Sequence, residues 1–441
     1  MDINAAILKI GEVVWGWPMV AFVLIACLVL MVALRFVQFR YFFHAWRVTF
    51  APSSDASTKS DMTPFQAFVN ALSSSIGNGS LAGVATAIYS GGPGAALWIF
   101  VFGFLAMGLR FSEAYLGTVF NAKDAGETFG GPFIYLKKVP GGVILANVFA
   151  IFFFLIGMVS GNAMQANSVS LSLDRAFGIS PWYVAVALFL FVLYALLGGA
   201  HRIVILSEAI TPIKVALFFI SAFIVFGYHY TTLIPALLLI IKSGLSIKAF
   251  TGGAIGYTIQ QAMRFGVART INSSEAGLGT AAVFFGASGG KRPVDNGFMA
   301  MLGTFISANL VCFLLAWIIV ASGVWNSGLT STPLTSAAFE TVFGTAGGWI
   351  VTFLAVTFGI GVLVAYSYAA RMSWLFLTKN KHLWLFNIIF PSVALVGAVA
   401  KVDIIWNSGD IINACLIVMN MYGILWLLPM IRRDVLAYKG K

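Results

Sequence analysis

The amino-acid sequence predicts an all-α polytopic membrane protein with about eleven transmembrane helices. Hydrophobic residues make up 60% of the 441 residues and charged residues only 9%, whereas a soluble domain carries about 25% charged residues. The apolar residues form windows of about 20, the length that crosses the hydrocarbon core as a helix. Two windows at corresponding places in the two halves of the chain are rich in glycine. This pattern predicts a 5+5 inverted repeat plus one extra N-terminal helix.

The first window, near residues 17–38, is expected to be a retained helix and not a signal peptide. Acidic Asp2 and Glu12 precede it in place of a basic cluster, and no small-residue cleavage site follows. The other windows lie near 64–90, 94–120, 142–172, 181–200, 205–228, 251–272, 296–323, 346–376, 383–400 and 406–430. A shorter apolar segment at 232–242 is expected to lie along the membrane surface.

We expect a single transmembrane domain over residues 1–441. Residues 1–60 would form the peripheral helix and its cytoplasmic loop, residues 61–230 the first repeat and residues 250–430 the second.

The basic residues predict the orientation. If the loop after the first window is cytoplasmic, 21 lysines and arginines fall on that side and 5 on the other. Arg110, Lys214 and Arg371 are among the 21. Cytoplasmic loops carry the excess of Lys and Arg, so the N-terminus is expected outside and the C-terminus inside. Because the basic residues are spread over short loops, the net charge of +11 does not indicate a nucleic-acid partner.

The segment Ser73–Val84 interrupts the second window. Its sequence, Ser-Ser-Ser-Ile-Gly-Asn-Gly-Ser-Leu-Ala-Gly-Val, is poor helix material. In lipid, unpaired backbone costs several kcal/mol, so a break survives only inside protein or beside a polar cavity. Transporters use such breaks to present amides and carbonyls to a substrate and an ion. The seventh window opens with a similar segment, Thr251-Gly-Gly-Ala-Ile-Gly-Tyr. The alternative in both places is that glycine only allows close helix packing.

Seven motifs occur in order along the chain. They are Phe36-Val-Gln-Phe-Arg40, Thr63-Pro-Phe-Gln-Ala67, Ile76-Gly-Asn-Gly-Ser-Leu-Ala-Gly83, Gly91-Gly-Pro-Gly-Ala95, Gly130-Gly-Pro-Phe-Ile-Tyr135, Gly252-Gly-Ala-Ile-Gly256 and Ser273-Ser-Glu-Ala-Gly-Leu-Gly-Thr-Ala281. On these motifs the chain resembles the alanine/glycine:cation symporter family of prokaryotic amino-acid carriers. The resemblance implies a leucine-transporter-like fold in the plasma (inner) membrane of a prokaryote.

The chain departs from that family's pattern at the ion site. The family's break usually has the sequence Gly-Thr-Gly-Asn-Ile, whereas Gly77–Leu81 is Gly-Asn-Gly-Ser-Leu. A hydroxyl pair that the resemblance would use for sodium is replaced by Ile360 and Gly361. A pocket aromatic is expected at Tyr366. The fold expectation is unaffected, but the coupling ion and the exact substrate stay open.

An amino-acid substrate would need donors for its carboxylate and acceptors for its ammonium group. Backbone amides at a half-helix N-terminus suit the carboxylate, and carbonyls near a second break at Gly256–Gln261 suit the ammonium. Asn162 and Gln165 are three residues apart and share a helix face near Ser160. The resemblance favours Gln165. The expected substrate-binding residues are Gly77, Asn78, Gly79, Ser80, Gln165, Gly256, Gln261 and Tyr366.

A coupling sodium ion would prefer hard oxygen ligands. The first break offers Ser74, Ser75 and Ile76. Proton coupling is the alternative, with a carboxylate near a window boundary: Glu113, Glu208 or Asp410.

Three further charged residues follow or lie within the seventh window. Glu275 is expected to cap a helix or form part of a gate. Arg264 and Arg269 are expected to anchor the inner face.

Together these observations predict a secondary active symporter that imports alanine or glycine with a cation, sodium being the expected ion. No metal-binding histidine pair, nucleophile elbow or phosphate-binding glycine-lysine loop occurs, so no enzyme activity is expected. No cofactor is expected beyond the coupling ion, and the partners are the substrate, the cation and the lipid bilayer. The alternatives are an uncoupled or proton-coupled carrier and a non-transporting membrane protein on the same fold.

Overall fold

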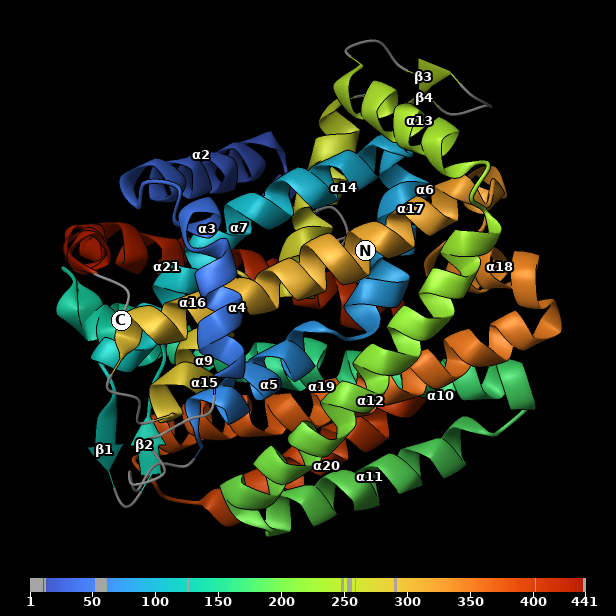
Figure 1. Cartoon of the computed structure of the whole chain (residues 1–441). Helices are drawn as coiled ribbons and strands as arrows, with labels where there is room; N and C mark the ends of the chain where they lie inside the picture. Colours follow the sequence, from blue (N-terminus) through green and yellow to red (C-terminus); the bar gives the residue numbers. More distant parts are fainter. Residues whose placement is uncertain are drawn as a thin grey trace.

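The computed structural model describes residues 11, 13–51, 62–124, 127–246, 250–251, 256–257, 259–288, 292–400 and 402–438. Nearly all of them are helical, and the long helices pack side by side (Figure 1). Two short antiparallel sheets lie in loops. One pairs β1 (Ala122–Asp124) with β2 (Glu127–Phe129), and the other pairs β3 (Phe250–Thr251) with β4 (Gly256–Tyr257).

The helices of the described residues fall into eleven successive segments that match the eleven predicted windows. They are α2 (Trp17–Ala33), α5 (Pro64–Ser75) with α6 (Val84–Gly91), α7 (Gly94–Val119), α9 (Gly142–Met158) with α10 (Met164–Phe177), α11 (Pro181–Leu197), α12 (Gly199–Tyr228), α14 (Ile259–Ser274) with α15 (Thr280–Ala287), α16 (Pro293–Thr304) with α17 (Phe313–Ala321), α19 (Thr345–Thr378), α20 (Leu383–Val399) and α21 (Val402–Ala437). Six segments are long and apolar enough to cross a membrane unaided, and others are shorter or interrupted.

Short elements connect or continue these segments. They are the α-helices α3 (Val37–Arg40), α4 (Phe42–Phe50), α8 (Pro132–Tyr135), α13 (Leu233–Leu245) and α18 (Ser331–Phe343), the 3₁₀ turns η2 (Leu136–Lys138) and η5 (Val324–Asn326), and the π-helical turns η1 (Gly79–Gly83), η3 (Val159–Ala163) and η4 (Phe305–Cys312). α13 corresponds to the expected short segment and packs on α7 and α17. α18 was not predicted, and it packs on α19 and η1.

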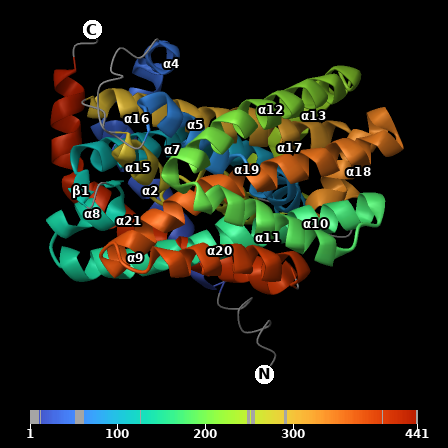
Figure 2. The ribbon, with the colours of Figure 1, turned by 90° about the horizontal axis from the view of Figure 1, so that it is seen from below.

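The centre of the molecule is built around α7 and α19. α7 packs against α14, α15 and α16, and α19 packs against α9, α10, α12 and α18. The outer helices expose large apolar side chains, for example Trp182, Leu197 and Ile213. Figure 2 shows α11 and α20, two of these outer helices, side by side. An apolar exterior around a core that contains buried charges is the reverse of a soluble protein and fits a lipid environment.

The first predicted break is confirmed. α5 begins with a capping box: Gln66 donates its backbone N–H to the Thr63 hydroxyl (3.2 Å), and Thr63 donates its own to the Gln66 side chain (3.0 Å). The helix ends at Ser75, and Ile76 has non-helical backbone angles (φ −93°, ψ 88°). The chain resumes at Gly79 as the π-helical turn η1.

The second break lies elsewhere than predicted. α14 runs without interruption from Ile259 to Ser274, so Gln261 lies inside a continuous helix, and Gly256 lies before it in β4. Gly252–Ile255 and Thr258 lie outside the described residues. The interruption comes after Ser274, where Glu275, Gly277 and Gly279 all have positive φ (55°, 93° and 86°). Three left-handed residues within five cannot continue a right-handed helix.

The two broken helices cross in opposite directions. α5 packs on α15, while η1 and α6 pack on α14. The first half of each broken helix therefore lies beside the second half of the other. This antiparallel arrangement is the one expected of inverted repeats, and it brings the two breaks together at the centre of the molecule.

Among the described residues, three of the 21 basic residues assigned to the cytoplasmic side are buried inside helices. Arg110, Lys214 and Arg371 are within α7, α12 and α19, with 2%, 0% and 6% of their surfaces exposed. A charge at such a position is costly unless it has a partner, so it carries no information on loop orientation. The excess on the predicted cytoplasmic side remains large without them, and the orientation of the termini stays a prediction.

Candidate functional site

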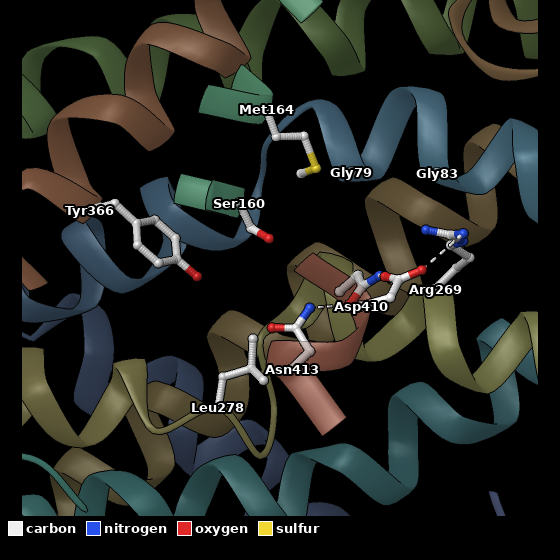
Figure 3. Close-up of a pocket in the computed structure, with 10 residues that line it drawn as sticks. Gly79, Gly83, Ser160, Met164, Arg269, Leu278, Tyr366, Asp410 and Asn413 are labelled. Carbon is white, nitrogen blue, oxygen red and sulfur yellow. Dashed lines mark hydrogen bonds and ion pairs between the residues drawn. The ribbon is translucent and has the colours of Figure 1, made fainter. Parts of the chain in front are cut away.

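A cavity lies where the two breaks meet (Figure 3). Both halves of the chain form its wall, because the lining residues come from η1, η3, the start of α10, α14, the second break, α19 and α21. The lining residues are Gly79, Gly83, Ser160, Met164, Arg269, Asn272, Leu278, Tyr366, Asp410 and Asn413. Two of the predicted substrate-binding residues, Gly79 and Tyr366, are among them.

Gln165 joins the first break to the π-helical turn η3. Its side-chain oxygen accepts the backbone N–H of Asn78 (3.2 Å), and its side-chain nitrogen donates to the carbonyl of Ser160 (3.0 Å). At Gly77 the chain passes so close to α19 that a Cβ would lie 2.5 Å from Cγ2 of Val362. Glycine is therefore required at this point of the break.

Asn78 carries a polar group that is still available for a ligand. Its side-chain nitrogen is buried and has no hydrogen-bond partner among the described residues. A Cβ on Gly359 would come within 2.9 Å of that nitrogen, so the small residue leaves room for the carboxamide. A buried donor without a partner is rare in folded proteins, and at a helix break it is a candidate ligand contact.

Tyr366 closes one side of the cavity. Its ring lies against the backbone of η3, where a Cβ on Gly161 would be 2.2 Å from the ring carbon Cγ. The Tyr366 ring therefore cannot move away from the cavity without displacing the backbone of η3. Its hydroxyl interacts with the carboxylate of Glu275 in the second break, and Figure 3 shows it pointing into the cavity.

A buried charged cluster stands behind the second break. Arg110 donates to the carbonyl of Glu275 (3.0 Å) and to the hydroxyl of Thr280 (2.7 Å). The Glu275 carboxylate accepts hydrogen bonds from Ser74 (2.6 Å) and Thr280 (2.7 Å). Ser74 belongs to α5, so Glu275 links the two broken helices directly. Glu275 was expected to cap a helix or form part of a gate. It lies in the second break itself, and only 2% of its surface is exposed.

Glu113 holds the second break in its left-handed form. One carboxylate oxygen accepts the backbone N–H groups of Gly277 and Gly279 (both 2.9 Å) and the side-chain nitrogen of Asn420 (2.7 Å). The other lies 3.3 Å from Arg110. As expected, Glu113 lies toward the end of α7 and pairs with Arg110, and it is fully buried there.

A second ion pair faces the cavity. Arg269 and Asp410 approach to 3.6 Å, and Asn272 donates to Asp410 (2.8 Å). Asn413 in turn donates to Asn272 (2.7 Å). Figure 3 shows the head groups of Arg269 and Asp410 turned toward each other. The expectation that Arg269 anchors the inner face is therefore wrong. Glu208, another carboxylate considered above, accepts a hydrogen bond from Gln66 (3.2 Å).

The residues predicted to bind sodium have protein partners. Ser74 donates to Glu275, and Ser75 donates to the carbonyl of Leu72 (3.1 Å). The carbonyl of Ile76 accepts from the ammonium group of Lys214 (2.7 Å). Ser80 donates to the carbonyl of Ser75 (3.4 Å), which steadies the turn that follows the break.

The structure does not bring Gly256, Gln261 or Asn162 to the cavity. Gly256 lies in β4, and Gln261 is in the first turn of α14, about 20 Å along that helix from Glu275 at 1.5 Å per residue. Asn162 donates to the carbonyl of Phe390 (2.6 Å) on α20, a bond between helices. Arg269, Asn272 and Asn413 were missed as site residues. Their signal was a polar side chain inside a predicted transmembrane window.

Comparison with known proteins is consistent with this arrangement. The sodium/alanine symporter AgcS of Methanococcus maripaludis is 30% identical to this chain and aligns with 99% of it and 98% of the relative. The probable sodium/glutamine symporter GlnT of Bacillus subtilis is 28% identical over 94% of this chain and 86% of the relative. A solved manganese transporter of Eremococcus coleocola superposes with a TM-score of 0.51 at 17% identity, covering 88% of this chain and 80% of the other, which shows the fold alone.

The sequence model of the sodium:alanine symporter family matches residues 1–441. The fold and the broken helices of the described residues agree with this family match. The chain belongs to the sodium:alanine symporter family.

Proposed function

We propose that this protein is a secondary active symporter that imports small neutral amino acids, alanine or glycine first, together with a cation. The observation that carries the proposal is the cavity at the meeting point of the two helix breaks, lined from both halves of the chain. Breaks of this kind offer unpaired amides and carbonyls in an otherwise apolar core. The names of the relatives supply the chemical class of the substrate.

A zwitterion suits the groups around the cavity. Arg269 and Asp410 give the cavity one positive and one negative side chain. An amino acid with no net charge would therefore leave the net charge of the cavity unchanged. Asn78 does not itself line the cavity, but it precedes the lining residue Gly79, and its buried carboxamide nitrogen is an additional donor for a carboxylate. Because the Tyr366 ring is held against Gly161, the space beside it would admit a small side chain more readily than a large one.

Alternating access would use the antiparallel pair of broken helices as a moving unit. Ser74 and Glu275 connect them (2.6 Å), so a change at one break is transmitted to the other. Symport requires that the amino acid and the cation bind more tightly together than apart, and this coupling is reciprocal. A coupling free energy of about 1–3 kcal/mol corresponds to an effect of about 5- to 150-fold on either affinity.

The test is uptake of radiolabelled alanine into proteoliposomes under an inward sodium gradient, an inward proton gradient, or neither. Accumulation above the external concentration under either gradient supports symport. Equilibration without accumulation would identify an uncoupled carrier, and the absence of uptake of alanine, glycine and glutamine would contradict the proposal. Empty liposomes and competition by unlabelled glycine and leucine control for leak and for substrate size.

A further inference from the structure

Lys214 is a buried charge in the middle of α12. None of its surface is exposed. Its ammonium nitrogen, Nζ, donates to the backbone carbonyls of Ser73 and Ile76, each at 2.7 Å. Because α5 ends at Ser75, these carbonyls belong to the last turn, where helical N–H partners are missing and the helix dipole is negative. The ammonium group therefore satisfies oxygens that the break leaves free.

No carboxylate of the described residues forms an ion pair with Lys214. The acid that acts on it electrostatically is Glu275, which accepts a hydrogen bond from Ser74. The Phe358 ring on α19 lies 5.8 Å from Nζ. The other titratable groups on the helices packed against α12, and on α12 itself, are Tyr183, Tyr194, His201, Arg202, Glu208, Tyr228, Glu340, Tyr366, Tyr368 and Arg371; α5 and α17 carry none.

Gly361 on α19 completes the surroundings of this ammonium group. A Cβ on residue 361 would lie 2.7 Å from Nζ of Lys214 and 3.2 Å from the hydroxyl oxygen of Ser73. Residue 361 is one of the two positions where the family resemblance leads us to expect a sodium-binding hydroxyl. In this chain the space for such a hydroxyl is filled by the lysine side chain.

The oxygens around Nζ are those that a hard metal cation would use. Backbone carbonyls are typical ligands of such ions, and the lysine ammonium is a compact point charge with three donors. A metal ion and the ammonium group cannot both occupy the position between the carbonyls of Ser73 and Ile76. The predicted sodium ligand Ile76 is thus already engaged by a cation that belongs to the protein.

We propose that the Lys214 ammonium replaces the coupling metal ion at the first helix break, so that no sodium ion binds between the carbonyls of Ser73 and Ile76. The inference rests on the proposed symport function. The ammonium group holds the end of α5 against α12 and α19, and Gly361 leaves the space that it fills.

The first experiment separates this inference from the proposed function. Exchange of labelled for unlabelled alanine across proteoliposomes, with no gradient, tests whether alanine is a substrate. Accumulation is then compared under an inward proton gradient and an inward sodium gradient. We expect exchange, and no added accumulation under the sodium gradient compared with a matched potassium gradient. Exchange combined with sodium-driven accumulation would overturn the role of Lys214 and leave the symport proposal standing.

The second experiment needs no substrate. The double variant Lys214→Ala/Gly361→Ser frees the two carbonyls and adds a hydroxyl where the lysine was. We expect sodium, but not potassium or choline, to raise its melting temperature, since a ligand that binds only the folded state stabilises it. The wild type should show no sodium-specific shift. Sodium-specific stabilisation of the wild type would contradict the proposal even if the lysine variants fail to fold.

Discussion

Replacing Glu113 is expected to destabilise the second helix break more than any change at its surface. In Glu113→Ala, the N–H groups of Gly277 and Gly279 and the side chain of Asn420 lose their common acceptor. Arg110 also loses the carboxylate that lies 3.3 Å away. All of these groups are buried, so water cannot easily replace the missing oxygen.

The magnitude follows from the number and kind of lost bonds. A buried donor left unsatisfied costs about 1–3 kcal/mol, and removal of one partner of a buried ion pair costs about 3–5 kcal/mol. These contributions share one carboxylate and are not additive. We therefore expect Glu113→Ala to lower the free energy of unfolding by about 3–5 kcal/mol. Glu113→Gln keeps an acceptor oxygen for the two glycine N–H groups but loses the charge beside Arg110, so its cost should be intermediate.

The assay is reversible unfolding in mixed detergent and SDS micelles, followed by tryptophan fluorescence. The expected order of stability is wild type, then Glu113→Gln, then Glu113→Ala. Glu340→Ala on α18 is the control, because that carboxylate is outside the cluster and should change stability by less than about 0.5 kcal/mol. If Glu113→Ala unfolded at the same SDS fraction as the wild type, the argument that this carboxylate stabilises the break would be refuted.

Two further substitutions test the cavity. Gly161→Ala places a methyl group 2.2 Å from Tyr366. The overpacking should lower the free energy of unfolding by about 1–3 kcal/mol and reduce alanine uptake. Gly227→Ala is the control, because a Cβ there meets open space, and it should change neither the stability nor the uptake. Gln165→Ala removes the acceptor of the Asn78 N–H and should weaken alanine binding about 5- to 150-fold, the equivalent of 1–3 kcal/mol. Unaltered affinity in a folded Gln165→Ala protein would rule out that role.

Local sequence properties were sufficient to predict the helical segments and the first break. Hydropathy over windows of about 20 residues depends on composition alone, and the eleven windows match the eleven helical segments of the described residues. Gly77–Ser80 combines residues that disfavour a helix within a few positions, and the chain leaves the helix there at Ile76. Gln165 was singled out as a buried amide, and the structure places it against this break.

The position of the second break depended on contacts between distant segments. Gly252–Gly256 is as rich in glycine as the true break, so composition could not distinguish the two. What fixes the break at Glu275–Gly279 is a carboxylate on α7, which accepts the N–H groups of Gly277 and Gly279. A hydrogen bond between residues more than 160 positions apart leaves no local signal in either segment.

Lys214 shows the same division between sequence and tertiary structure. The sequence alone placed it with the loop charges, because an isolated lysine inside a membrane helix is unfavourable. Only the folded chain supplies the two carbonyls of the broken α5 at 2.7 Å and the space left by Gly361. The sequence determined which segments are helical and where α5 fails, since both follow from local composition. The tertiary structure decided which buried charges share a site, since that depends on the approach of helices far apart in the chain.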